Sequence, residues 1–306
     1  MASEFDLIRR YFDRPAKGAV LGVGDDAALL RVGAGMELAA STDMLVEGRH
    51  FRAGAEPRAL GHKALAVNLS DMAAMGAAPR WAMLALALPR EDEAWLAGFS
   101  AGFFALAERF GVDLVGGDTT RAPAGGPLVV SVTILGEVPR DLALFRAGAL
   151  AGDDIWVSGS LGGAALALER PGDAAAARRL DEPEPRVDLG EHLRGIAHAA
   201  IDVSDGFAQD LGHILERSGV GALVEYARLP RFPGAEPRHV LAGGDDYELV
   251  FTARQDRRGD IEALGARLGL PLARVGAIQR GEPKLVVLDE AGRPLAAPRG
   301  FDHFAA

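Results

Sequence analysis

The sequence contains no cysteine, which excludes disulfide bridges, cysteine-based zinc sites and cysteine nucleophiles, so any catalysis must use oxygen and nitrogen groups. Its only lysines, Lys17, Lys63 and Lys284, are not followed by Ser or Thr, so a Walker A phosphate-binding loop is absent. The longest apolar run, near residues 81–88, is far shorter than the roughly 20 residues that span a bilayer. Charged residues also interrupt any signal-peptide core in the first twenty positions. We therefore expect a cytoplasmic protein with no membrane partner.

The charge balance and the length limit the class of protein further. A formal net charge of −10 would repel nucleic acid phosphates, so nucleic acid is not an expected partner. The 306 residues, 49% of them apolar, suffice for two domains with buried cores. Periodicity is lost between residues 138 and 153, which also contain Pro139, Gly148 and Gly152. The sequence predicts domains at 1–146 and 147–306.

Hydrophobic periodicity predicts alternating helices and strands in both halves, which indicates an α/β fold with mixed sheets. The expected strands are 19–23, 37–40, 81–88, 128–135, 155–157, one ending at residue 203, and 247–251. The expected helices are 57–75, 91–110, 164–169, 206–217 and 260–268, after an N-terminal helical pattern near residues 5–12. The Pro- and Ala-rich stretch 171–189 is expected to be partly mobile surface structure with a short helix inside.

The informative feature is a set of aspartates that follow apolar segments and stand among Gly, Ser and Thr. A single such Asp is more often a turn or helix-capping residue. An ionised carboxylate near a buried element is costly unless it is paired or binds a cation, and several together therefore favour a metal site. Mg²⁺ prefers a few carboxylates with waters and substrate phosphates, and neighbouring glycines let backbone approach a phosphate. The set is Gly24-Asp25-Asp26, Ser41-Thr42-Asp43, Ser70-Asp71, Gly116-Gly117-Asp118, Asp202-Val203-Ser204-Asp205-Gly206 and Gly243-Gly244-Asp245-Asp246.

Other catalytic signatures are missing or incomplete. Residues 22–27 match the G-x-G-x-x-A dinucleotide pattern, but they place two carboxylates where a pyrophosphate would need backbone donors. The H-R-D and D-F-G signatures of protein kinases do not occur, and residues 158–162 lack the first glycine of a serine-hydrolase elbow. The seven histidines show no H-E-x-x-H spacing. The interpretation that remains is a site for a metal ion and a nucleotide that has no P-loop.

Long motifs in a fixed order resemble the thiamine-monophosphate kinase family, which belongs to the superfamily of aminoimidazole ribonucleotide synthetase and selenophosphate synthetase. The resemblance covers nearly the whole chain. It is carried by residues 22–27 (GVGDDA), 41–51 (STDMLVEGRHF), 63–77 (KALAVNLSDMAAMGA), 116–121 (GGDTTR), 201–206 (IDVSDG), 244–249 (GDDYEL) and 300–304 (GFDHF).

The resemblance implies the two-domain aminoimidazole ribonucleotide synthetase-like fold and a homodimer in which the N-terminal sheets meet. It implies phosphorylation of thiamine monophosphate to thiamine diphosphate, the last step of thiamine diphosphate biosynthesis. ATP would be the co-substrate, in a cleft lined by the aspartates. Several Mg²⁺ ions are expected, and a K⁺ requirement stays open. Carried over, the magnesium residues are Asp26, Ser41, Thr42, Asp43, Asp71, Asp118, Asp202 and Asp205; the ATP residues are Gly117, Asp118, Arg146 and Ser204; the thiamine phosphate residues are His50 and Asp245.

Two positions depart from the family pattern. Asp245 stands where members often have Glu, and Pro298 stands where some have a tryptophan that stacks on the substrate. We therefore expect Phe301 to supply the stacking ring. The acceptor phosphate, with a second pKa of about 6, is largely dianionic at neutral pH, so we expect direct in-line transfer without a general base or a phosphoenzyme.

Two alternatives stay open at this point. One is another ATP-using synthetase of the same superfamily, although the lack of cysteine disfavours the selenophosphate branch and the His50 and Asp245 motifs match the thiamine branch more closely. The other is a non-catalytic sensor of nucleotide or metal. Turnover with a phosphorylated acceptor would separate the enzymes from the sensor.

Overall fold

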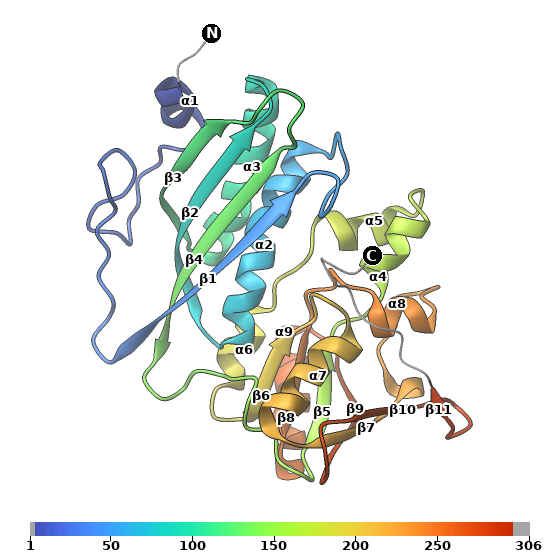
Figure 1. The fold of residues 1–306 in the computed structure, drawn as a ribbon. Coiled ribbons are helices and arrows are strands. Elements are labelled where there is room, and N and C mark those ends of the chain that lie inside the picture. The colour runs from blue at the N-terminus through green and yellow to red at the C-terminus, as the bar shows by residue number, and fades with distance from the viewer. Residues whose placement is uncertain (1–3, 296–306) are drawn as a thin grey trace. The chain divides into compact units, whose positions relative to one another are not determined.

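The computed structural model describes residues 4–295, and the chain divides into two compact units (Figure 1). Unit 1 comprises the chain up to Met72 together with Ala77–Arg140, and unit 2 comprises Ala73–Gly76 together with the chain from Asp141 onward. Each unit contains a sheet with both parallel and antiparallel strand pairs, which confirms the predicted α/β class with mixed sheets. Within residues 4–295, no helix has both the length and the apolar character needed to cross a bilayer.

Unit 1 is a four-stranded sheet with the order β1-β4-β2-β3. Strands β2 and β3 pair in parallel, whereas β4 is antiparallel to both β1 and β2. Figure 1 shows α2 and α3 side by side on one face of this sheet. The elements are α1 (Glu4–Tyr11), β1 (Met36–Val46), α2 (Pro57–Ala74), β2 (Ala78–Leu88), α3 (Glu93–Phe110), β3 (Asp113–Arg121) and β4 (Val129–Pro139).

Glycines allow the two helices of unit 1 to pack backbone against backbone. A Cβ atom at Gly61 would lie 2.0 Å from the Phe99 carbonyl oxygen, and one at Gly102 would lie 1.8 Å from the Arg58 carbonyl oxygen. Any larger residue would therefore push α2 and α3 apart. The close contact fixes the position of α2, the helix that carries Asp71.

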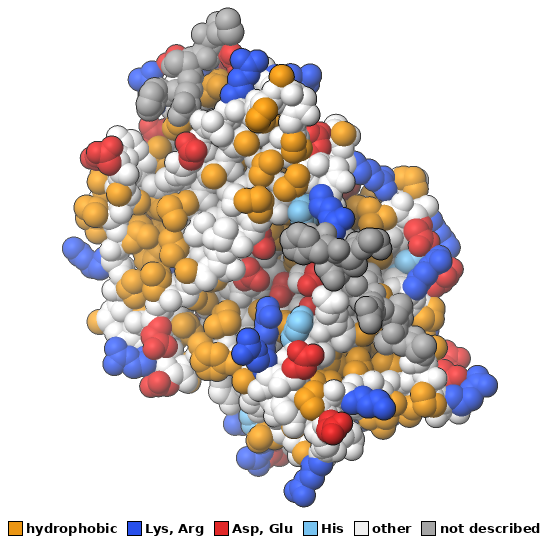
Figure 2. Space-filling model, viewed as in Figure 1, with side chains coloured by type: hydrophobic (Ala, Val, Ile, Leu, Met, Phe, Trp, Pro, Cys, Tyr) orange, Lys and Arg blue, Asp and Glu red, His pale blue; other side chains and the backbone are white. Residues whose placement is uncertain are grey.

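The strands of unit 1 bury one side and leave the other open. In β4, Val130, Val132 and Ile134 are buried, and the residues between them are not fully buried, as the period of two requires. The open side exposes apolar side chains in patches that Figure 2 shows over the strands. Leu38, Met44 and Met83 are 48%, 57% and 38% exposed.

Unit 2 is a seven-stranded sheet with the order β11-β10-β7-β9-β5-β8-β6 among the described residues. Its strands are β5 (Asp154–Ser158), β6 (Ala197–Asp202), β7 (Gly221–Glu225), β8 (Leu249–Ala253), β9 (Leu272–Gln279), β10 (Leu285–Leu288) and β11 (Pro294–Leu295). Its helices are α4 (Gly163–Glu169), α5 (Ala174–Asp181), α6 (Val187–Leu193), α7 (Phe207–Ser218), α8 (Pro237–Ala242) and α9 (Arg258–Leu268), with 3-10 turns η1 (Tyr226–Arg228) and η2 (Gln255–Arg257).

The core of unit 2 forms where α7 packs on the sheet. Phe207, Leu211 and Ile214 of α7 are completely buried in one cluster with inward-facing residues of β5, β6 and β8. Trp156 and Phe251 alternate with those strand residues and therefore lie on the opposite face, where their rings stack with centroids 6.4 Å apart. Both faces of the central strands are covered, so every residue of β5 and β8 is buried, including the polar Asp154, Ser158 and Thr252.

Local structure differs from the expectation in three places. Residues 19–23 form no strand and make only isolated bridges, Leu21 with Leu29 and Val23 with Asp25. Strand β3 was not expected, because its glycines and polar residues hide the strand pattern. The short helix expected within 171–189 is confirmed as α5, but the stretch also contains the start of α6 and packs into the unit, with Ala176 and Leu189 buried.

Candidate functional site

The carboxylates of Asp43 and Asp71 form the central pair of unit 1. Asp43 lies within β1 and Asp71 within α2, so neither follows the end of an apolar element. Burial, and then the negative charge of Asp71, raise the pKa of Asp43 to about 7. Two carboxyl groups that oppose each other's ionisation are stabilised by a cation that binds both. This pair therefore fits a divalent metal ion.

Neighbouring polar groups orient this pair. The Ser41 hydroxyl donates to Oδ2 of Asp71 at 2.5 Å, and the Asp43 N–H donates to Oδ1 of Asn68 at 3.2 Å. Thr42 alternates with Ser41 and Asp43, and its hydroxyl pairs with that of Thr133 at 2.8 Å on the open side of the sheet. Thr42 can therefore reach a cation beside Asp43 only through its backbone carbonyl.

Asp118 lies on the far edge strand from Asp43. Asp43 pairs in register with Val132, Val132 with Leu84, and Leu84 with Gly117, so three strand spacings of about 4.8 Å separate β1 from β3. Asp118 is the next residue of β3 after Gly117; it is exposed and pairs in register with Ala85 of β2. Asp43 and Asp118 are therefore not brought together within unit 1.

The glycine before Asp118 has a steric explanation. A Cβ atom at Gly117 would lie 1.8 Å from the Leu84 carbonyl oxygen of the adjacent strand. Packing alone therefore requires glycine here, whether or not its backbone also contacts a nucleotide.

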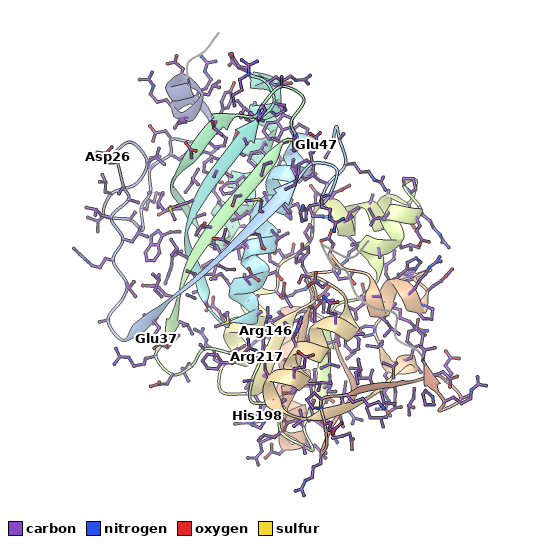
Figure 3. All side chains as sticks on the ribbon, viewed as in Figure 1. Asp26, Glu37, Glu47, Arg146, His198 and Arg217 are labelled. Carbon is purple, nitrogen blue, oxygen red and sulfur yellow. The ribbon has the colours of Figure 1, made fainter. Side chains whose placement is uncertain are left out.

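Asp26 and His50 occupy loops of unit 1. Asp26 is exposed in the long segment between α1 and β1, where Figure 3 labels it. His50 lies in the turn after β1, and its Nδ1 accepts the Val46 N–H at 3.0 Å. In neutral His50 the proton therefore resides on Nε2. That turn fixes the ring and leaves Nε2 as a donor.

The aspartates of unit 2 lie in the loop between β6 and α7. Asp202 ends β6 and is buried, and Asp205 lies in the turn that follows. Oδ2 of Asp210, on α7, accepts three consecutive backbone N–H groups, from Ser204 at 3.1 Å, Asp205 at 3.1 Å and Gly206 at 3.0 Å. Burial, and then Asp205, raise the pKa of Asp210 to about 7, against the effect of these donors. Asp210 therefore shapes the loop that carries Ser204 and Asp205.

The segment 243–248 is bonded to the same loop and contains strained backbone. The N–H groups of Asp245 and Tyr247 donate to the carbonyls of Ser204 and Val203 at 2.9 and 2.8 Å. Both donors have positive φ, 64° for Asp245 and 50° for Tyr247, which is rare for residues with a side chain. The Tyr247 hydroxyl also donates to Oδ1 of Asp245 at 2.9 Å. Such strain is typical of functional segments.

The next carboxylates in this segment are structural. Asp246 is buried, and its Oδ2 accepts the Gly162 N–H at 2.6 Å just before α4. Burial raises the pKa of Asp246 to about 7. Glu248 is fully buried between Arg179 of α5 and Arg186 at the start of α6, with contacts of 2.8 and 2.6 Å. These arginines hold the pKa of Glu248 below its usual value despite burial, and they anchor the stretch 171–189.

The remaining predicted residues are placed as follows. Arg146 lies early in unit 2, where its carbonyl accepts the Ser218 hydroxyl at 3.4 Å, and Figure 3 labels its side chain near the end of α7. Phe301 and Pro298 lie outside the described residues. Sequence reasoning assigned no role to Asn68, Asp210 and Tyr247. Asn68 and Tyr247 lie within the motifs 63–77 and 244–249, and the four-residue spacing from Gly206 is the pattern that could have indicated Asp210.

Within residues 4–295, no three His, Asp or Glu side chains are grouped as in a preformed metal centre. Asp43 and Asp71 form a carboxylate pair whose mutual repulsion a divalent ion would relieve. Its carboxylate and hydroxyl oxygens are also the ligands that Mg²⁺ prefers. The residues therefore fit magnesium better than a softer metal.

Comparisons with known proteins agree over the full chain. Residues 24–138 match the family of AIR synthase related protein, N-terminal domain, and residues 151–287 match the C-terminal domain. The thiamine-monophosphate kinase of Escherichia coli K12 is 44% identical, over 99% of this chain and 98% of that protein.

Solved structures of relatives agree in fold as well. A thiamine-monophosphate kinase from Stenotrophomonas maltophilia K279a is 44% identical with a TM-score of 0.83, covering 94% of this chain and 95% of that one. A structure described as AaThiL complexed with AMPPCP and TMP is 31% identical with a TM-score of 0.77, covering 98% and 96%. The chain therefore belongs to the thiamine-monophosphate kinase family, within the AIR synthase related proteins.

Proposed function

We propose that this protein transfers the γ-phosphoryl group of ATP to the phosphate of thiamine monophosphate, giving ADP and thiamine diphosphate. The strongest support is the similarity to the thiamine-monophosphate kinase of Escherichia coli K12, which covers 99% of this chain. The structure of a 31% identical relative with AMPPCP and TMP supports the same pair of substrates. Most of the motifs on which the resemblance rested lie within the ranges 24–138 and 151–287 that match the two family domains.

Magnesium is part of the proposal. Asp43 and Asp71 would hold it in unit 1, with Ser41 orienting Asp71, and Asp202 and Asp205 would hold it in unit 2. We keep Asp26, Asp118 and the Thr42 carbonyl as further proposed ligands. Bound magnesium would supply neutralisation of negative charge on the phosphoryl oxygens during transfer. K⁺ is a further proposed cofactor.

The role of the protein in the chemistry is to position groups. The acceptor phosphate is already largely dianionic at neutral pH, so no side chain needs to remove a proton from it. We propose that His50 Nε2 and Asp245 contact the thiamine phosphate, and that Gly117, Arg146, Asp118 and Ser204 contact ATP. The Asp210 bonds and the Asp245 strain support this, because they hold the loop that carries Ser204 in one conformation.

We propose that two copies associate through the open face of the unit 1 sheet, with unit 1 serving nucleotide and metal binding as well as dimerisation. The exposure of Leu38, Met44 and Met83 on that face supports this, since such apolar patches commonly mark interfaces. Light scattering should give about twice the chain mass of 32.1 kDa. Met44→Lys should reduce the measured mass toward that of one chain. A single-chain mass for the unmodified protein would contradict this. We also propose the cytoplasmic location that the sequence predicts.

The experiment that tests the activity is ADP release by purified protein with ATP and Mg²⁺. Thiamine monophosphate, thiamine and an aminoimidazole precursor are compared as acceptors, and the product is identified by mass. Thiamine diphosphate formed only from the monophosphate is the expected result. Turnover only with another acceptor would favour a different enzyme of the superfamily, and binding without any turnover would favour a sensor.

A further inference from the structure

The segment that carries Asp26 is an exposed loop of unit 1, called here the Asp26 loop (residues 18–33) (Figure 1). Its arms are joined by hydrogen bonds from the N–H groups of Val20 and Leu21 to the Leu29 carbonyl, at 2.8 and 3.2 Å. The Leu29 N–H donates back to the Leu21 carbonyl at 3.0 Å. None of residues 18–33 is buried, and Val20 and Leu29 are 57% and 54% exposed. The loop therefore buries no side chain that could anchor it in the core.

The first end of the loop is anchored at Gly18. Its N–H donates to Oδ2 of Asp113 at 2.5 Å, and its carbonyl accepts the Trp81 Nε1–H at 3.1 Å. Trp81 is buried and pairs in register with Asp113, the first residue of β3. Both polar groups of Gly18 are thus bonded to the place where β2 and β3 begin.

The second end of the loop is anchored at Gly33. Its N–H donates to Oε1 of Glu137 at 2.6 Å, and the other oxygen, Oε2, accepts the Arg80 Nε–H at 3.1 Å. The register between β2 and β4 shifts from Pro79 to Trp81, so Arg80 has no partner residue in β4. Such bulges commonly redirect a side chain, and here the Arg80 side chain lies against Glu137. One carboxylate therefore joins the loop to two strands.

The Glu137 carboxylate is too far from the central carboxylate pair to bind the same ion. Glu137 pairs in register with Leu38 of β1, and Asp43 lies five residues further along that strand. At about 3.3 Å per residue, this places Glu137 about 16 Å from Asp43 along the sheet. Both Glu137 oxygens also accept hydrogen bonds from protein donors already. Any effect of Glu137 on metal binding must therefore pass through the loop.

We propose that Asp113 and Glu137 are positioning residues, which hold the two ends of the Asp26 loop and so set where Asp26 is presented to Mg²⁺. The inference rests on the proposed function for the role of Asp26 as a ligand. A loop that is held at both ends has fewer conformations to lose when its carboxylate binds an ion. These two hydrogen bonds replace the core packing that the loop lacks.

The first test removes the acceptor at the second end. Glu137→Ala should weaken binding of Mg²⁺ alone, measured by calorimetry, about fivefold. The Mg²⁺ concentration that gives half-maximal activity should rise by the same factor, with kcat at saturating Mg²⁺ within about twofold. Glu137→Gln keeps an oxygen for the Gly33 N–H and should restore most of the affinity. Unchanged affinity in the Ala variant, or an equal loss in both variants, would overturn the proposal.

The matched control is Glu37→Gln. Glu37 is an exposed carboxylate at the start of β1, where Figure 3 labels it, and it pairs in register with Val138, the neighbour of Glu137. It contributes to neither anchor of the loop, so its replacement should leave Mg²⁺ affinity unchanged.

The second test asks whether Glu137 acts through Asp26. When Asp26→Asn is already present, adding Glu137→Ala should change Mg²⁺ affinity by less than about twofold, because the loop no longer carries the ligand. A residue that only stabilises unit 1 would lower affinity by the same factor with or without Asp26. Equal effects in the two backgrounds would therefore contradict a positioning role.

The third test follows the loop without metal or turnover. Arg31 is exposed two residues before Gly33, so trypsin should cleave after Arg31 several times faster in Glu137→Ala than in the unmodified protein or Glu37→Gln. Asp113→Ala should likewise speed cleavage after the exposed Lys17, and it replaces Glu137→Ala if that variant folds poorly. If the kinase assay fails but the cleavage and Mg²⁺ results hold, the activity is refuted and the positioning role stands. Unchanged cleavage in both variants would refute the positioning role.

Discussion

Unit 1 holds half-buried carboxylates and unit 2 holds fully buried ones, and the surroundings of these groups differ. In unit 1, Asp43 and Asp71 face each other, and the hydrogen bond that Asp71 accepts from Ser41 does not remove their repulsion. In unit 2, Glu248 faces two arginines, and Asp210 and Asp246 face backbone N–H groups. A buried carboxylate with its own protein donors stabilises the fold, whereas two that oppose each other are set to bind a cation.

The two sets of carboxylates also differ in what their replacement would cost. Replacing Glu248 would leave charged arginines without a partner in the interior, which costs folding free energy. Replacing Asp43 would relieve repulsion in the protein without metal and would cost only binding and turnover. The predictions below separate stability from activity for each set.

The largest expected effect on folding is at Glu248. Glu248→Gln should lower the free energy of unfolding by about 3–5 kcal/mol, because Arg179 and Arg186 stay buried without a countercharge. Urea denaturation measures this. Glu182→Gln, which breaks an exposed pair with Arg178 on α5, is the control and should change stability by less than about 1 kcal/mol. Equal effects of the two variants would contradict the structural role of Glu248.

A large loss of activity, with no loss of stability, is expected when Asp43 is replaced. Asp43→Asn should lower kcat by roughly 10²- to 10³-fold, as for the loss of one group that stabilises transition-state charge. Its unfolding free energy in EDTA should equal or exceed that of the unmodified protein, because repulsion by Asp71 is removed. Glu37→Gln should leave both quantities unchanged. Strong destabilisation by Asp43→Asn would place Asp43 with the structural carboxylates instead.

The pH dependence of stability sharpens the same contrast. Because the folded protein raises the pKa of Asp43 from 3.8 to about 7, folding favours its protonated form. Its favourable contribution is full below about pH 4 and is lost as the pH rises to about 7. In EDTA, the difference in unfolding free energy between Asp43→Asn and the unmodified protein should therefore shift in favour of the variant across that range. Saturating Mg²⁺ should reduce this shift, and a pH-independent difference would contradict it.

Part of this arrangement could be predicted from the sequence. The apolar stretches of the sequence located α2 and α3 closely, and α2 is buried on nearly all sides rather than along one stripe. The motifs singled out the aspartates of both units by their residue types. The side of β1 on which Thr42 lies also follows from simple strand alternation, once β1 is known to run through it.

The rest depended on contacts between distant residues. The strand predicted at 19–23 has the right composition but no neighbouring strand to pair with beyond Leu29. The stretch 171–189 looked mobile by composition, yet Glu248 holds it from more than sixty residues away along the chain. Nor does spacing show that Asp71 meets Ser41 and Asp43, because that depends on where α2 crosses the sheet. Local pattern selects candidates, and long-range packing decides their roles.

The smallest expected effect is at Asp210, whose role is to position the loop between β6 and α7. Asp210→Asn keeps one side-chain oxygen for the N–H groups of Ser204, Asp205 and Gly206, so stability should fall by only about 1 kcal/mol and kcat by a few fold. Asp210→Ala removes the acceptor and should weaken Mg²⁺ binding, measured by calorimetry, much more than the Asn variant does. If Asn and Ala weaken Mg²⁺ binding equally, the charge of Asp210 matters rather than its hydrogen bonds. Asp210 would then belong with Asp43 and Asp71, and the contrast between the two units would not hold.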